Sequence, residues 1–225
     1  LVLQYKGNQL LDLRMPLKIS RVEEMYRRVN LAHIIQGSSQ STPTATGNPQ
    51  GWPDAYTDDR YFAFLHGYNV SQEDARGWLS QMFKRLFWSG SQARFIGVTW
   101  DGKPGGLLAS NYYRAVRNAF LTSEHLAGAL SFIPSNDLVI SAHSLGNMVV
   151  SSTIRPARIY HDLELDGPVA WQPDQYFLFN AAVPIEAYDS SQTHGTGGGG
   201  TMWSNIRNPN WTINGHDYHD RLTAS

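Results

Sequence analysis

The sequence contains no cysteine, and this absence excludes disulfides, thiolate metal sites and a cysteine nucleophile. It also lacks an excess of charge of either sign, because 18 Lys and Arg residues stand against 19 Asp and Glu residues. A formal net charge of −1 gives no basic surface of the kind that binds nucleic acid or an anionic membrane. No apolar run approaches the roughly 18 residues that predict a transmembrane helix. None of these absences distinguishes a cytoplasmic from a secreted protein.

The 225 residues, 41% of them apolar, are enough for one sizeable domain with a hydrophobic core. Short apolar runs typical of buried strands alternate with longer segments in which apolar residues recur every three or four positions. The predicted strands cover residues 61–65, 93–100, 137–143 and 174–182, and the predicted helices cover 71–88, 111–130 and a segment beginning near 145. This alternation predicts an α/β fold with a mostly parallel sheet and helices on both faces.

The N-terminal part of the chain has a different character. It predicts a short strand at Leu1–Tyr5 and a helix from about Ser20 to Ile35, whose start has the capping-box spacing of Ser20 and Glu23. Residues 36–54 are rich in Gly, Ser, Thr and Pro, which is typical of a loop. We therefore expect an N-terminal extension at 1–58 and an α/β domain at 59–225.

The stretch "LVISAHSLGNMVV" places Ser144 between a predicted strand and a predicted helix. Small residues flank it at Ala142 and Gly146, which is the pattern of a nucleophile elbow with Ala in place of the first Gly. The turn is so tight that larger side chains at these two positions would collide. The alternative is a serine that only caps the helix, and the motif alone leaves both interpretations open.

A second element, "FLHGYN", follows the first strand of the predicted sheet. An elbow serine needs an additional backbone donor from a loop after an earlier strand, and Gly67 lets the chain approach a substrate oxygen closely. We expect the N–H groups of Tyr68 and Leu145 to form the oxyanion hole. For His66 we expect a supporting role, as a buried side chain that holds the turn by hydrogen bonds.

The segments "FLHGYNVSQEDA", "FIGVTWDG" and "LVISAHSLGNMVV", in this order, resemble the α/β-hydrolase fold. More narrowly, they are similar to bacterial hydrolases of unknown function that share an HGYN loop, a strand ending in a Trp and a small-His-Ser-small-Gly elbow. The resemblance covers about Tyr61 to Asp189. It implies hydrolysis of an ester or a related acyl group by a Ser-His-acid triad, without a metal or another cofactor.

In this fold the acid follows the serine in the chain, at the end of a later strand. The segment "YFLFNAAVPIEAYD" offers Asp189, which we favour, with Glu186 as the alternative. The fold implies two further strands after this segment, but residues 192–225 show no convincing strand pattern. The C-terminal part of the domain is therefore expected to be irregular or incomplete.

The base is expected near the C-terminus, where "NWTINGHDYHD" contains two histidines. We favour His216, which directly follows a glycine, over His219 and the more distant His194. His143, beside the serine, is expected to support the elbow. Neighbouring aspartates at 217 and 220 give only weak evidence for a metal site, because surface polarity explains them equally well.

These features predict a carboxylesterase or lipase-like enzyme that acts on a small-molecule ester or a lipid through an acyl-enzyme on Ser144. One alternative is an inactive hydrolase fold that serves as a binding or scaffold domain, because the acid and the base are less clearly marked than the serine. Another is an acyltransferase or a peptidase on the same fold, since a fold does not determine the substrate.

Overall fold

The computed structural model describes residues 2–12, 20–35, 44–104, 109–134, 137–162, 173–183, 212–213 and 216–217. The strands of the described chain are β1 (Val2–Tyr5), β2 (Asn8–Asp12), β3 (Arg27–Asn30), β4 (Thr44–Ala45), β5 (Tyr61–Leu65), β6 (Arg94–Thr99), β7 (Leu138–His143), β8 (Gln175–Phe179), β9 (Thr212–Ile213) and β10 (His216–Asp217). The α-helices are α1 (Ala32–Ile35), α2 (Gln72–Trp88), α3 (Ala109–Ala129) and α4 (Gly146–Asp162). Two 3-10 turns lie at Val22–Glu24 and Asp54–Tyr56.

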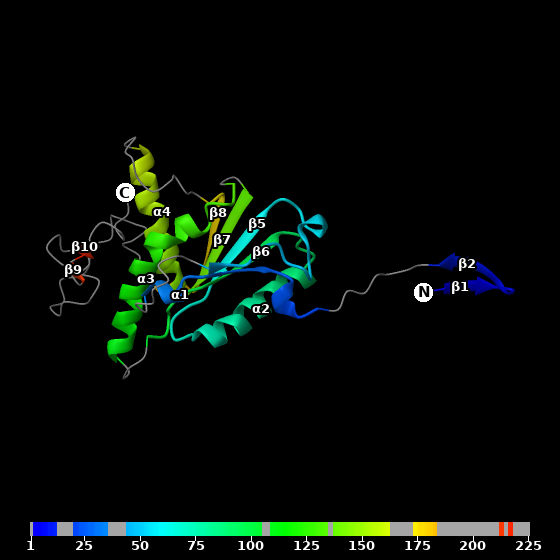
Figure 1. The fold of residues 1–225 in the computed structure, drawn as a ribbon, viewed down its shortest axis with the longest axis horizontal. Helices are drawn as coiled ribbons and strands as arrows, with labels where there is room; N and C mark the ends of the chain where they lie inside the picture. Colours follow the sequence, from blue (N-terminus) through cyan, green and yellow to red (C-terminus); the bar gives the residue numbers. More distant parts are fainter. Residues whose placement is uncertain are drawn as a thin grey trace.

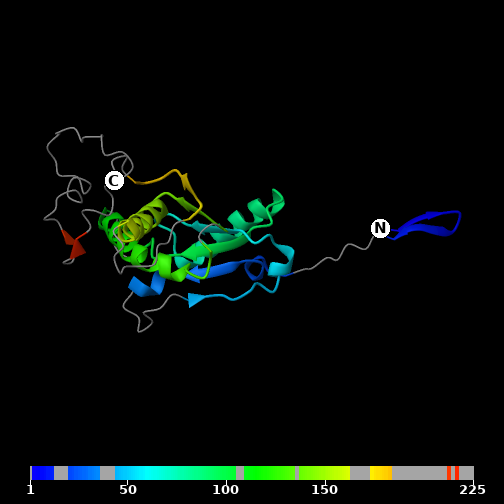
Figure 2. The same cartoon turned by 90° about the horizontal axis from the view of Figure 1, so that it is seen from above.

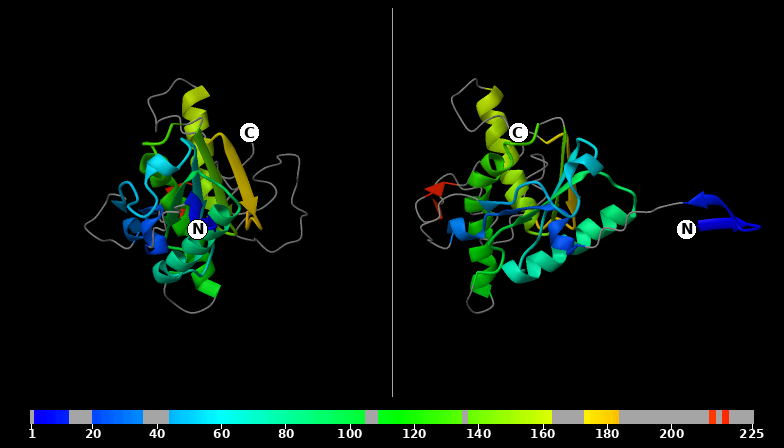
Figure 3. Two further views of the ribbon diagram at one scale, coloured as in Figure 1. Left: turned by 90° about the vertical axis from the view of Figure 1, so that its right-hand side faces the viewer. Right: turned by 45° about the vertical axis from the view of Figure 1, so that its right-hand side comes forward.

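A six-stranded sheet forms the centre of the molecule, in the order β4-β3-β6-β5-β7-β8 (Figure 1). Strands β3, β6, β5, β7 and β8 are parallel, and only the two-residue β4 at one edge is antiparallel to its neighbour. Strand β8 lies at the other edge, beside β7 (Figure 3). The predicted α/β class and the mostly parallel sheet are therefore confirmed.

The helix predicted from Ser20 to Ile35 is wrong. A 3-10 turn, strand β3 and the four-residue α1 occupy this stretch, and the side chain of Ser20 does not cap a helix here. Strand β3 pairs in parallel with β6, and its residues alternate between buried and partly exposed. Pairing with the otherwise open edge of β6 outweighs the weak helical spacing of the sequence, because tertiary context routinely overrides local propensity.

Strands β3 and β4 precede residue 59, the predicted start of the hydrolase domain, yet both belong to the central sheet. Only the β1–β2 hairpin, whose first strand confirms the predicted strand at Leu1–Tyr5, forms a separate sheet in this part of the chain. The structure thus places the 44–58 segment and the β3 region with the sheet. The boundary at 58 itself stays a prediction.

Helix α2 covers one face of the sheet at β5 and β6 (Figure 2). Its predicted cap is confirmed, because the Ser71 hydroxyl accepts a hydrogen bond of 3.0 Å from the Asp74 N–H. Apolar residues from α2, β5, β6 and the β3 region form a small cluster on this face: Tyr26, Phe64, Leu79, Phe83 and Phe95. Gly97 leaves room for Leu79, since a Cβ at this position would lie 2.8 Å from a Leu79 methyl group.

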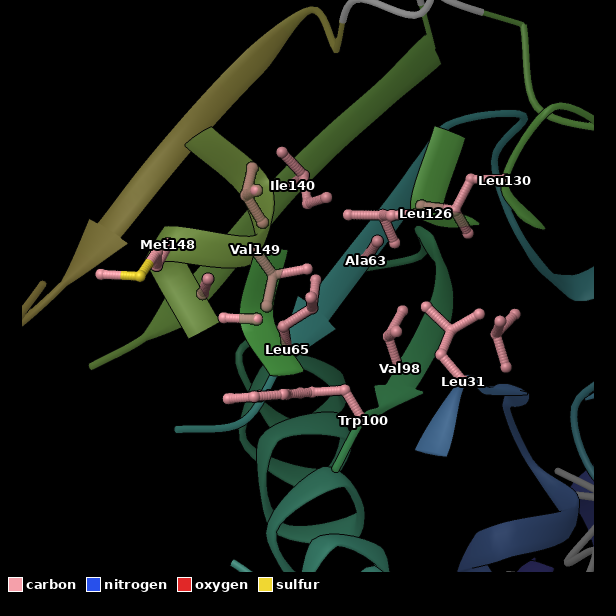
Figure 4. Packing of buried hydrophobic residues seen from close by; sticks show 14 of the residues in the cluster. Leu31, Ala63, Leu65, Val98, Trp100, Leu126, Leu130, Ile140, Met148 and Val149 are labelled. Atoms are coloured by element: carbon pink, nitrogen blue, oxygen red, sulfur yellow. The ribbon is translucent and has the colours of Figure 1, made fainter. Parts of the chain in front are cut away.

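Helices α3 and α4 pack against each other on the opposite face, together with α1. The larger hydrophobic cluster lies here, where alternate residues of β5, β6 and β7 meet the helices. Figure 4 shows Leu65, Val98 and Trp100 within this cluster. The predicted arrangement of helices on both faces is confirmed, and it leaves the carboxyl ends of β5, β7 and β8 side by side at one edge of the sheet.

The C-terminal region contains a short antiparallel pair, β9 and β10, where no strand was expected from the sequence. The two strands flank Asn214-Gly215, a dipeptide favoured in two-residue hairpin loops. This pair is separate from the central sheet. In the described part of the chain, no helix combines the length and the apolar character needed to cross a bilayer.

Candidate active site

Ser144 lies in the turn between β7 and α4, and its φ of +51° places it in the left-handed region. A residue other than glycine in this region carries strain of about 1–2 kcal/mol, so the surrounding structure has to hold it there. The end of β8 does so. The Ser144 N–H donates to the Phe179 carbonyl at 2.9 Å, and the Ala182 N–H donates to the Ser144 carbonyl at 3.1 Å.

Ser144 is partly exposed, and its hydroxyl has no hydrogen-bond partner among the described residues. A serine that caps a helix has an extended backbone and accepts a hydrogen bond from the first turn with its side chain. Here the Asn147 N–H bonds instead to the backbone carbonyl of Ser144, at 3.1 Å. The geometry therefore favours the nucleophile elbow over the helix cap.

Two glycines allow the loop after β5 to lie directly against this turn. The pairing of Leu65 with Ala142 brings the ends of β5 and β7 level. A Cβ at Gly146 would collide with the carbonyl oxygen of His66, and a Cβ at Gly67 would lie 2.8 Å from Cβ of Ser144. Both positions thus need glycine for steric reasons, as the sequence motifs indicate.

His66 is fully buried, and both of its ring nitrogens have backbone partners. Nδ1 lies 3.0 Å from the Gly67 carbonyl oxygen, and Nε2 accepts a hydrogen bond of 3.2 Å from the Trp100 N–H. A carbonyl oxygen can only accept, so Nδ1 carries the proton and Nε2 is the acceptor. The ring also stacks on Trp100, whose indole N–H donates to the His66 carbonyl at 2.7 Å.

Burial lowers the pKa of His66 to about 4, although its backbone hydrogen bonds act in the opposite direction. The imidazole is therefore neutral near pH 7, with one defined tautomer. A ring with both nitrogens engaged inside the core has no free site for a proton taken from Ser144. This arrangement supports the expected role of His66 as a structural residue.

The two N–H groups predicted as the oxyanion hole belong to Tyr68, which follows Gly67, and to Leu145, which follows the serine. Neither Tyr68 N–H nor Leu145 N–H has a hydrogen-bond partner among the described residues. Leu145 immediately precedes α4, where the helix dipole favours negative charge. The loop that contains Tyr68 is anchored by the adjacent Asn69, whose N–H donates to the Gly102 carbonyl at 2.8 Å. The roles of the two groups stay predictions.

His143 points to the face of the sheet that α2 covers. Its ring stacks on Trp78 of α2, with 5.4 Å between the ring centroids and 26° between the ring planes. A Cβ on Gly67 would lie 2.9 Å from Nδ1 of His143 and 2.8 Å from Cβ of Ser144, so both side chains pack against this glycine. This contact with α2 agrees with the supporting role expected for His143.

The predicted base and acid come from the C-terminal part of the chain. His216 belongs to β10, but its side chain lies outside the described residues, as do His219, Asp189 and Glu186. Their pairing with Ser144 therefore stays a prediction. The described residues also contain no group of three or more His, Asp or Glu side chains arranged to hold a metal ion.

Sequence reasoning placed Trp100 at the end of a strand but assigned it no contact with His66, and it did not single out Asn147. Trp100 fixes His66 through both of its N–H groups, and Asn147 binds the Ser144 carbonyl through its side-chain amide at 2.9 Å. A tryptophan at the end of a strand and an asparagine three positions after the serine are visible in the sequence. Their partners become visible only once the strands are placed side by side.

No curated protein matches this sequence. Residues 55–185, more than half of the chain, match the family described as "Alpha/beta hydrolase of unknown function (DUF900)". The match covers both glycine-containing turns and Ser144, and it confirms the resemblance that the motifs indicated. The chain therefore belongs to this family of α/β hydrolases.

Proposed function

We propose that the protein is a serine hydrolase that cleaves carboxylic esters, of a small molecule or a lipid, through an acyl-enzyme on Ser144. The observation that carries the proposal is the state of Ser144. Its backbone is held at a φ of +51° between β7 and α4, the residue is partly exposed, and its hydroxyl is unpaired among the described residues. Strain of this kind at a strand-to-helix turn is characteristic of a functional site.

In the proposed reaction, Oγ of Ser144 attacks the ester carbonyl while His216 takes the hydroxyl proton. The Tyr68 and Leu145 N–H groups stabilise the resulting oxyanion, and loss of one such donor typically lowers the rate by about 10²–10³. The C–O bond of the ester then breaks, and His216 returns the proton to the leaving alcohol. Water, activated by the same histidine, hydrolyses the acyl-enzyme and regenerates Ser144.

Asp189 is proposed to hold His216 in the tautomer that this proton transfer requires, with Glu186 as the alternative acid and His219 as the alternative base. The neutral and fully engaged imidazole of His66 supports a separate histidine for catalysis. Replacing His216 and His219 singly by alanine separates the two candidates. The true base is the one whose loss abolishes ester turnover.

A fluorophosphonate probe tests the nucleophile directly, because it forms a bond only with an activated serine. We expect the wild type to be labelled and to hydrolyse p-nitrophenyl acetate or butyrate, and Ser144→Ala to do neither. Ser141→Ala is the matched control, since Ser141 lies in β7, the strand that ends next to Ser144, and its hydroxyl donates to the Phe177 carbonyl of β8. This control should still be labelled.

A folded wild type that is not labelled would contradict the proposal. The alternative from the sequence, an inactive hydrolase fold that serves as a binding or scaffold domain, would then explain the elbow better. Circular dichroism of the same preparation shows whether the protein is folded, so that an unfolded sample is not taken for an inactive one.

A further inference from the structure

A cavity of about 740 Å³ lies against α2 on the side of β7 and β8. We call it the α2 cavity, and its apolar lining consists of Phe64, Val70, Trp78, Met82 and Phe179 together with the ring of His143. Its volume falls within the range of about 300–1,000 Å³ that is usual for small-molecule sites. Such sites are mainly apolar, with a few polar groups that orient the ligand.

The α2 cavity is lined by the residue that precedes the proposed nucleophile, although Ser144 itself is not part of the lining. His143, which lines the cavity, directly precedes Ser144. Both side chains lie against Gly67, since a Cβ on this glycine would be within 3 Å of an atom of each. Asn69 and Asn180, from the loops after β5 and β8, also line the cavity, and both have a positive φ. The cavity therefore reaches the edge of the sheet at which Ser144 lies, and it continues along α2.

Two large apolar side chains in the lining are unusually exposed. Trp78 is 47% exposed and Phe179 is 46% exposed, although each belongs to an element of the core domain. The stack of Trp78 on His143 holds the indole in place and forms one wall, while the buried Phe64 belongs to the lining on β5. The charged residues that line the cavity, Glu73, Asp74 and Arg85, are all exposed, so their charged groups reach solvent.

We propose that the α2 cavity binds the acyl group of the substrate, and that this acyl group is apolar and larger than acetyl. The inference rests on the proposed acyl-enzyme at Ser144. In that intermediate the acyl carbon is bonded to Oγ, so the rest of the acyl group must extend into space that adjoins Ser144. The leaving alcohol instead has to reach the base, which is predicted in the C-terminal region.

A series of p-nitrophenyl esters tests the proposal, because the leaving group stays constant while the acyl group grows from acetate through butyrate to hexanoate. Each methylene buried in the cavity is expected to raise kcat/KM by up to about fourfold. We therefore expect the hexanoate-to-acetate ratio of kcat/KM to exceed about ten in the wild type.

Two variants alter the cavity in different ways. Trp78→Ala removes the wall, and Gly77→Leu fills the cavity from the same helix, at a position where a Cβ has open space around it. Each is expected to lower the hexanoate-to-acetate ratio by about tenfold. Trp88→Ala is the matched control, since Trp88 lies ten residues further along α2, is 73% exposed and does not line the cavity. It should leave the ratio unchanged.

The outcomes separate this inference from the proposed function. A wild type with neither probe labelling nor turnover contradicts both. A wild type that is labelled, but shows no acyl-length preference or hydrolyses none of the three esters, overturns the acyl cavity and leaves the activated serine in place. Equal losses for acetate and hexanoate would instead assign the cavity to the nitrophenyl leaving group.

A second copy of the chain is the other possible occupant of an exposed aromatic wall. Sedimentation velocity of the wild type and of both cavity variants tests it. A dimer that dissociates in Trp78→Ala and Gly77→Leu, with an unchanged ester ratio, would overturn the proposal in favour of a subunit interface. A sedimentation coefficient that is the same in all three proteins, with a changed ratio, supports the acyl site.

Discussion

The side-chain amide of Asn147 donates a hydrogen bond of 2.9 Å to the carbonyl oxygen of Ser144. The same NH₂ group lies 3.4 Å from the Phe179 carbonyl, and the amide oxygen accepts a hydrogen bond of 2.9 Å from the Tyr176 hydroxyl. Asn147 is fully buried. One side chain in the first turn of α4 thus connects the serine turn to two residues of β8, Tyr176 and Phe179.

We predict that Asn147→Ala slows the reaction of Ser144. The substitution leaves the half-buried Tyr176 hydroxyl and the Ser144 carbonyl with fewer partners, at a cost of about 1–3 kcal/mol in the free energy of unfolding. It also removes a contact that holds the strained turn. We expect the rate constant for fluorophosphonate labelling to fall by about tenfold or more at a temperature where the variant is fully folded.

Ser141→Ala provides the comparison for this prediction. It also removes a side-chain hydrogen bond to β8, of 3.1 Å to the Phe177 carbonyl, but it does not contact Ser144. Its free energy of unfolding should fall by up to about 1.5 kcal/mol, with an unchanged labelling rate constant. A labelling rate that stays at the wild-type value in Asn147→Ala would show that Asn147 serves stability alone.

The central strands could be predicted because each is a short apolar run bounded by turn residues, and the long helices because their apolar residues recur every three or four positions. Strand β3 could not be predicted in this way. Its residues, Arg27–Asn30, include two arginines and a single β-branched residue, and the strand forms because the edge of β6 is available to pair with it.

The candidate site also contains features that the sequence predicts and contacts that it does not predict. Ser144 with its flanking residues and the His66-Gly67 turn each form a contiguous stretch of sequence, so their tight turns could be predicted from local pattern. The Asn147–Tyr176 bond and the stack of Trp78 on His143 join residues of different elements. These contacts depend on strand order and helix placement, which no local pattern contains.

We predict that Gly146→Ala abolishes labelling of Ser144 and strongly destabilises the fold. The new Cβ would collide with the carbonyl oxygen of His66, a backbone atom that cannot move without displacing the loop after β5. Gly128→Ala in α3 is the control, because its Cβ would have nothing within 4 Å and alanine favours a helix by up to about 1 kcal/mol. Thermal unfolding should show a lower Tm for the first variant and an equal or higher Tm for the second. A fully active Gly146→Ala protein would contradict the close contact between the two turns.

We predict that Ser144→Gly is more stable than Ser144→Ala, although both lack the nucleophile. Glycine adopts a φ of +51° without the steric cost that alanine keeps, and the difference is expected to be about 1 kcal/mol in the free energy of unfolding. Urea denaturation of the two variants measures it. Equal midpoints would mean that the turn relaxes in both variants, so that the positive φ at position 144 is kept only when serine is present.

The depressed pKa of His66 predicts a dependence of stability on pH. The unfolded chain binds a proton at this histidine below its ordinary pKa of 6.5, whereas the folded protein does not until about pH 4. The contribution of His66 to the free energy of unfolding should therefore be constant above about pH 6.5. Between about pH 6.5 and 4 it should fall by roughly 1 kcal/mol for each pH unit.

An NMR titration of the wild type checks this pKa without a variant that disturbs the core. The Cε1 proton of His66, assigned through its proximity to the Trp100 indole, should keep the chemical shift of a neutral imidazole down to about pH 5. Its Nδ1 should remain protonated over this range, because the Gly67 carbonyl can only accept a hydrogen bond. A midpoint near 6.5 would instead mean that the ring is open to solvent, and it would restore His66 as a candidate base beside Ser144.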